Sequence, residues 1–77
     1  MKEMLEVIAK TIVDKPELVT VTEVEGESSS ILEIKTDATD LGKLIGKKGR
    51  TAQAIRTLVY SAAFKCKKRY QVEIQSL

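Results

Sequence analysis

Two glycines enclose two lysines near the middle of the chain, in the segment Gly46-Lys47-Lys48-Gly49. Glycine has no side chain and adopts positive φ angles at low cost, so a turn built on two glycines can lie close to another chain. The two lysines favour an anionic partner. A helical pattern begins directly after the second glycine, and the free N–H groups and dipole of a helix N-terminus also attract phosphate. These residues predict a phosphate-binding turn between two helices.

Other kinds of phosphate chemistry match the chain poorly. A nucleotide-binding loop has the pattern Gly-x-x-x-x-Gly-Lys-Ser/Thr, but here Gly46 follows Gly42 one residue too early. Lys48 also occupies the position where a hydroxyl group must bind Mg²⁺. The chain has no histidine and one cysteine, Cys66, which excludes a Cys-His pair and an internal disulfide. We therefore predict a protein that is not an enzyme and that holds no cofactor and no metal.

Acidic and basic residues are divided unevenly along the chain. The formal net charge is +2, but residues 1–40 carry a charge of −6 and residues 41–77 carry +8. The basic half begins beside the glycine motif. Such an asymmetry favours contact with nucleic acid, although a basic stretch alone can simply be a solvated surface. No apolar run is long enough for a signal peptide or a membrane span, so we expect a cytoplasmic protein without membrane contact.

Hydrophobic periodicity divides the 77 residues into six elements of a single domain, residues 1–77. Pro16 ends the first helix, because proline disfavours the helical conformation of the preceding residue. The first strand is expected to have a bulge or a frayed end near Glu23. Thr39 or Asp40 is the expected N-cap of the second helix. The expected elements are a helix 2–14, strands 18–25 and 31–36, a helix 40–45, the loop 46–49, a helix 50–66 and a strand 70–75.

The long helix 50–66 and the last strand are expected to bury one side each. The predicted inner face of the helix consists of Ile55, Leu58, Val59, Ala62 and Cys66, with alanines at neighbouring positions that allow close packing. In the last strand the apolar side chains, beginning with Tyr70, alternate with polar ones. This alternation is typical of a strand that is buried on one side only.

The order α-β-β-α-α-β predicts an α+β fold with two layers, in which helices cover one face of a three-stranded sheet. The first two strands are joined by a short loop and should pair as an antiparallel hairpin. The last strand follows a crossover of two helices, so it can lie parallel to the second strand. The sheet is therefore expected to be mixed.

The segment from Asp40 to Ala52, in this order of elements, resembles the type II KH domain, and more narrowly the bacterial single-domain KH RNA-binding proteins of the KhpA type. The resemblance covers nearly the whole chain. It implies single-stranded RNA binding, in which the Gly-x-x-Gly loop clamps the backbone of about four nucleotides. It also implies the role of an RNA chaperone or post-transcriptional regulator.

The same resemblance implies which residues contact RNA. The clamp would be formed by Gly46, Lys47, Lys48 and Gly49, and the apolar side of the groove by Leu44 and Ile45. Lys43 and Arg50 would add charge beside the clamp. The opposite wall would come from the last strand and the loop before it, with Lys67, Lys68, Arg69, Gln71 and Val72.

A protein-interaction module is the alternative, with RNA contact weak or secondary. A lone KH groove contacts few nucleotides, and pairing two copies would raise the effective concentration of the second site. The resemblance implies homodimers, and heterodimers with a larger KH-containing RNA-binding protein. Tyr60 and Phe64 form an i, i+4 aromatic pair that, with Arg56, marks the expected surface on the outer side of the long helix. Exposed rings for base stacking are expected to be nearly absent, because Tyr60 and Phe64 lie on or near helix faces and Tyr70 alternates inward, so stacking should contribute little to RNA binding.

Overall fold

The computed structural model describes the whole chain, residues 1–77. The elements, in order, are α1 (Lys2–Ile12), a short 3₁₀ helix η1 (Pro16–Leu18), β1 (Thr20–Glu25), β2 (Ser29–Thr36), α2 (Ala38–Ile45), a second 3₁₀ helix η2 (Lys47–Gly49), α3 (Arg50–Cys66) and β3 (Arg69–Ser76). The predicted order α-β-β-α-α-β is confirmed. None of the helices has both the length and the hydropathy of a membrane span.

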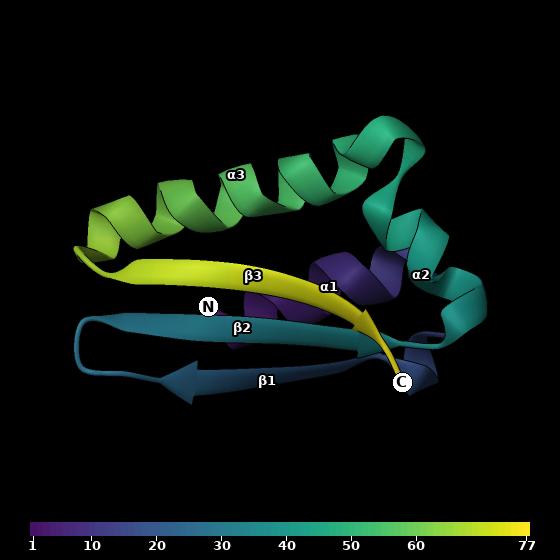
Figure 1. Ribbon diagram of the computed structural model, residues 1–77, viewed down its shortest axis with the longest axis horizontal. Coiled ribbons are helices and arrows are strands. Elements are labelled where there is room, and N and C mark those ends of the chain that lie inside the picture. The colour runs from purple at the N-terminus through teal and green to yellow at the C-terminus, as the bar shows by residue number, and fades with distance from the viewer.

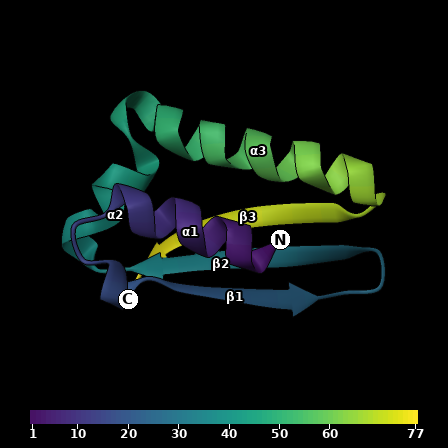
Figure 2. The ribbon, with the colours of Figure 1, turned by 180° about the vertical axis from the view of Figure 1, so that it is seen from behind.

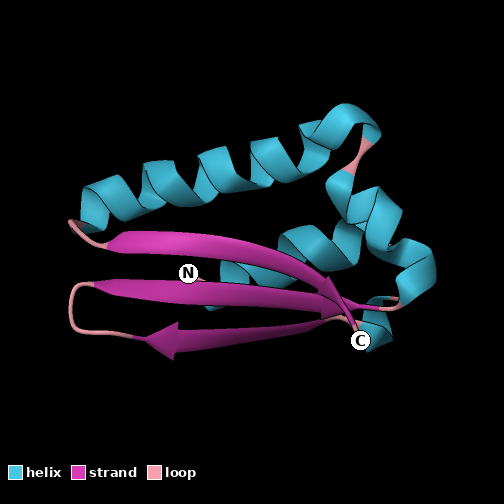
Figure 3. Cartoon of the chain, in the orientation of Figure 1, coloured by secondary structure: helices cyan, strands magenta, loops and turns pink.

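The three strands form one mixed sheet in the order β1-β2-β3. β1 is antiparallel to β2, and β2 is parallel to β3, as predicted from the hairpin and the two-helix crossover. α1 lies across one face of the sheet and α3 runs along β3, while the opposite face carries no helix (Figures 1 and 2). Short loops join the elements (Figure 3). The turn between α2 and α3 has a helix directly before it and a helix directly after it.

The hydrophobic core lies between the helices and the covered face of the sheet. β2 is central, and its Leu32 and Ile34 are fully buried. Full burial of such a side chain contributes about 1.5–3 kcal/mol. The core cluster is completed by side chains from the three α-helices, the other two strands and the residues beside them: Leu5, Ala9, Val13, Val19, Val21, Leu44, Ile55, Val59 and Val72.

The core-facing side of α3 differs from the predicted one. Leu58 is 53% exposed and Cys66 is exposed, so their placement in the core was wrong, and Ala62 is half-buried. Alanines at two positions let the helix approach the sheet closely, which turns the buried side away from Leu58. Cys66 lies in the last turn, where the chain leaves the helix for β3. The buried residues of α3 are Ala52, Ile55, Val59 and Ala63.

Several element bounds and local details also differ from expectation. α1 ends at Ile12 instead of residue 14, and β2 begins at Ser29 instead of residue 31. The pairing of β1 with β2 is continuous from Thr20 to Glu25, so there is no bulge near Glu23, and Val24 simply lies on the uncovered face. Leu18, the first residue of the predicted strand, ends the 3₁₀ turn η1, because Pro16 suits the first position of a helical turn.

α2 begins earlier than expected, at Ala38, with Asp37 in the N-cap position instead of Thr39 or Asp40. Asp40 is buried and binds the backbone N–H of Lys15. This tertiary contact, which no local pattern reveals, gives the carboxylate a role other than capping.

Candidate nucleic-acid interface

The turn between α2 and α3 has positive φ angles at three of its four residues. Gly46 has φ 77° and ψ 173°, Lys48 has φ 56° and ψ 26°, and Gly49 has φ 74° and ψ 13°. The conformation of Gly46 is one that only glycine adopts readily. The N–H of Gly49 donates to the carbonyl oxygen of Gly46 at 3.1 Å, which closes the turn.

The glycines of this region are not equivalent. A Cβ added to Gly46 would lie 2.6 Å from the Cβ and 2.7 Å from the backbone nitrogen of Thr51, because the turn folds back onto the start of α3. A Cβ added to Gly49 would meet nothing within 4 Å. Gly42 also has free space around it, so it does not serve close helix packing. At Gly46, a side chain is disfavoured both by the contact with Thr51 and by the backbone conformation. At Gly49, it is disfavoured by the backbone conformation only.

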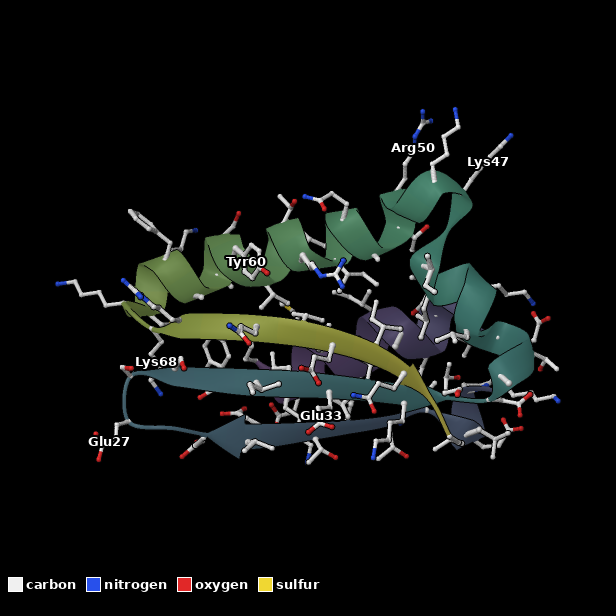
Figure 4. The ribbon with its side chains drawn as sticks, in the orientation of Figure 1. Glu27, Glu33, Lys47, Arg50, Tyr60 and Lys68 are labelled. Atoms are coloured by element: carbon white, nitrogen blue, oxygen red, sulfur yellow. The ribbon has the colours of Figure 1, made fainter.

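Three cations surround this turn without an ion-pair partner. Lys47, Lys48 and Arg50 are exposed, and no carboxylate lies within ion-pair distance of them. Figure 4 shows Lys47 and Arg50 pointing away from the body of the protein on the same side. No side chain caps the N-terminus of α3, although the N–H of Arg50 donates to the carbonyl oxygen of Lys47, and the helix dipole adds to the same positive potential.

Lys43 differs from these cations because its charge is already neutralised. Its ammonium group contacts the carboxylate of Asp14 and lies 3.6 Å from that of Asp40. The hydrogen bond to Asp14, together with the charges of both carboxylates, raises the pKa of Lys43. The structure therefore places Lys43 where it holds α2 against the end of α1. Of the two ion pairs of Lys43, only the one with Asp40 has a signal in the sequence, which is the i, i+3 spacing of the two residues.

A second polar contact positions the start of α2. The backbone N–H of Lys15 donates to Asp40 at 2.9 Å, and its side chain donates to Asp37 at 3.2 Å. The Thr39 hydroxyl also donates to Asp37, and these two side-chain hydrogen bonds lower the pKa of Asp37. Because α2 leads directly into the glycine turn, both contacts hold the turn in place. Sequence reasoning did not identify Lys15 or Asp37 as supports of the site.

The apolar pair before the turn is split between core and surface. Leu44 is fully buried, whereas Ile45 is 40% exposed. Of the two, only Ile45 offers apolar surface to a ligand. Leu44 packs in the hydrophobic core and anchors the end of α2 there.

Lys67, Lys68 and Arg69 lie at the other end of α3 from the glycine turn (Figure 4). A helix of 17 residues is roughly 25 Å long at about 1.5 Å per residue, so the two basic groups are well separated. Lys67 ends the helix in the left-handed conformation, with φ 56°. Its N–H donates to Phe64 and that of Lys68 to Ala63, which satisfies two terminal carbonyl groups.

The uncovered face of the sheet is a poor surface for RNA. Glu33 of β2 and Glu73 of β3 are partners in the strand register, and Glu33 projects from this face (Figure 4). Neither carboxylate has a cationic partner within ion-pair distance. Two neighbouring carboxylates repel phosphate, which disfavours RNA binding at this part of the face.

Comparison with known proteins places the chain in a family. The family described as "KhpA/KhpB, KH domain" matches residues 2–74. The RNA-binding protein KhpA of Clostridium perfringens is 60% identical over 74 residues, which cover 96% of this chain and 99% of that protein. The protein of the same name from Caldanaerobacter subterraneus is 55% identical, with the same coverage of each chain.

Solved structures with a similar fold include two of the protein Era. Era of Aquifex aeolicus bound to GDP and aluminium fluoride has a TM-score of 0.65 at 18% identity, over 99% of this chain and 30% of that one. Era in complex with MgGDPNP and nucleotides 1506–1542 of 16S ribosomal RNA has a TM-score of 0.63 at 20% identity. This match covers 97% of this chain and 29% of that one. The chain thus corresponds to less than a third of Era, and the likeness shows a shared type II KH fold. Because the family match spans nearly the whole chain and the two KhpA proteins named above share more than half of its residues, this protein belongs to the KhpA/KhpB KH-domain family.

Proposed function

We propose that this protein binds single-stranded RNA by clamping its backbone with the turn from Gly46 to Gly49. The observation that carries the proposal is the coincidence, at one turn, of a glycine in close contact with α3, three unpaired cations and an uncapped helix N-terminus. Each of these features suits a phosphate group. The name of the relatives, RNA-binding protein KhpA, supports the same conclusion.

The protein acts by binding and not by catalysis, as a member of a KH-domain family. Its cellular role is then that of an RNA chaperone or post-transcriptional regulator. Contacts to phosphate carry no sequence information, so a clamp of this kind binds many single strands with similar affinity. About three phosphate contacts predict a slope near −2 for log affinity against log salt concentration, from roughly −0.7 per contact on a single strand.

The test is RNA binding by a Lys47→Asp/Lys48→Asp variant, which reverses the charge of the turn and keeps both glycines. The matched control is Lys2→Asp/Lys10→Asp, which makes the same change in net charge at two exposed positions of α1. The turn variant should lose at least tenfold in affinity for a short single-stranded RNA, about 1.4 kcal/mol, and the control should change it only slightly. Equal losses in the two variants would mean that net charge, and not the turn, attracts RNA.

Pairing with a second KH-containing chain, either another copy or a KhpB-type protein, is a second candidate function. The family name joins KhpA and KhpB, and a single clamp gains avidity by pairing. Leu58 is half exposed on α3, at the flank of the buried stripe, and offers apolar surface for such a contact. Sedimentation velocity at rising concentration tests this candidate. A dimer that Leu58→Glu dissociates supports it, and a monomer at all concentrations refutes self-pairing.

A further inference from the structure

All the aromatic residues of the chain line one pocket. The sequence contains two tyrosines and one phenylalanine, and Tyr60, Phe64 and Tyr70 all border a cavity of about 430 Å³ where the end of α3 meets the start of β3. Tyr60 is 47% exposed and Phe64 84% exposed. The expectation that these rings are unavailable for stacking was therefore wrong.

The charged residues that line this pocket are both basic, and the adjoining hollow, which shares Lys68 and Arg69 with it, is also lined by Glu25 and Glu27. Lys68 and Arg69 line the pocket itself, no carboxylate does, and neither cation takes part in an ion pair. Ser29 and Gln71 add polar groups that can hydrogen-bond to a base edge. Exposed aromatic faces beside unpaired cations are the combination by which proteins hold single-stranded nucleic acid. An apolar protein segment would gain nothing from the two cations.

The pocket lies on a path that begins at the glycine turn. Arg56, Tyr60 and Phe64 follow one another at intervals of four residues, so they lie on one side of α3. From Arg50 to Tyr60 the helix rises by roughly 15 Å at about 1.5 Å per residue. This equals the length of about four nucleotides at a stacked spacing of roughly 3.4 Å. A strand held at the turn can therefore reach the pocket along this side of the helix.

We propose that this aromatic pocket is a second subsite for the RNA strand that the glycine turn clamps. One base stacks on the rings of Tyr60 and Phe64, and a phosphate beside it binds Lys68 and Arg69. The proposal rests on the proposed function, since the same strand occupies both places. A clamp for about four nucleotides then becomes a site for about eight or more.

Oligonucleotide length separates the two parts of the site. The probes are unstructured RNAs of alternating C and A, four and ten nucleotides long, and the variant is Tyr60→Leu/Phe64→Leu. Leucine favours the helix and keeps an apolar surface, so the exchange removes only the rings. Val7→Leu, at an exposed position of α1, is the control.

The double variant should bind the ten-nucleotide RNA about tenfold more weakly than the wild type and the four-nucleotide RNA equally well, since stacking on one base has about this magnitude. The ring-proton NMR signals of Tyr60 and Phe64 in the wild type should shift with the longer RNA and not with the shorter one. This second measurement does not depend on how the variant folds.

Three results would overturn the subsite. Equal affinities of variant and wild type for the longer RNA, without ring shifts, would remove it and leave the clamp intact, provided that Lys47→Asp/Lys48→Asp still loses binding. Wild-type protein that binds neither RNA would remove clamp and subsite together. A wild-type dimer that the leucine variant dissociates, with RNA affinity unchanged, would show that the rings contact a second protein chain.

Discussion

Replacing Gly46 by alanine should destabilise the protein far more than the same change at the other glycines of this region. The φ of 77° and ψ of 173° lie in a region almost closed to residues with a side chain, which costs up to about 3 kcal/mol. In addition, the new Cβ would lie 2.6 Å from the Cβ and 2.7 Å from the nitrogen of Thr51. These atoms belong to the first turn of α3 and cannot move without it. The expected total loss is about 3 kcal/mol or more.

Gly49 and Gly42 provide matched controls for this change. Gly49 has a left-handed conformation but open space around it, so Gly49→Ala should cost about 1–2 kcal/mol. Gly42 lies inside α2 with open space and an ordinary helical conformation, so Gly42→Ala should stabilise the protein by roughly 0.5–1 kcal/mol. The three single substitutions thus differ in sign and in size, although each adds one methyl group.

Urea denaturation gives the free energy of unfolding of each variant. RNA affinity is measured as well, because local opening of the turn can weaken RNA binding without changing the global free energy of unfolding. The expected order of stability is Gly42→Ala, wild type, Gly49→Ala, Gly46→Ala. If Gly46→Ala matched Gly49→Ala in both measurements, the contact with Thr51 would not constrain the turn. If Gly42→Ala kept its stability but lost RNA affinity, Gly42 would border the RNA.

Three further predictions concern stability. Lys67→Gly should stabilise the protein by about 1 kcal/mol in urea denaturation, because glycine adopts the left-handed conformation at the end of α3 without strain; an unchanged midpoint would contradict this. Asp37 has a lowered pKa because of its hydrogen bonds to Thr39 and Lys15, so its stabilising contribution is complete at neutral pH and is lost as the pH falls below about 4 through its folded-state pKa. Asp37→Asn should therefore weaken the acid dependence of stability between pH 5 and 2, and an identical pH profile would argue against these hydrogen bonds. Leu32→Ala, at a fully buried position of the central strand, should cost about 2–5 kcal/mol, and a loss below about 1 kcal/mol would mean that the core relaxes around the cavity.

The order of elements and the glycine turn follow from local patterns. Alternating β-branched residues predict the strands, Pro16 ends the first helical run, and the helix predicted at 50–66 has the same bounds as α3. The turn was recognised because its two glycines are three residues apart between helical patterns. Such features depend on the conformational preferences of residues a few positions apart, and a sequence displays these directly.

The side of α3 that meets the sheet was decided by packing. Two apolar stripes with helical periodicity overlap on this helix, one through Leu58 and one through Ala52 and Ala63. The second is buried, because small side chains let the helix approach β3. Alanine contributes little to a hydrophobic periodicity, and the periodicity contains no information on how closely two elements approach each other.

Tertiary structure alone also decided which charges are free and where the rings gather. Lys43 is neutralised by Asp14, 29 positions away, and Tyr70 of β3 joins Tyr60 and Phe64 of α3 in one pocket. These contacts bring together residues from different elements, so they depend on how the chain folds back on itself. The sequence by itself determined a turn of two glycines and two lysines in a KH-like order of elements. Only the folded chain showed which cations remain free for a ligand, and that the aromatic residues lie at the other end of the same helix.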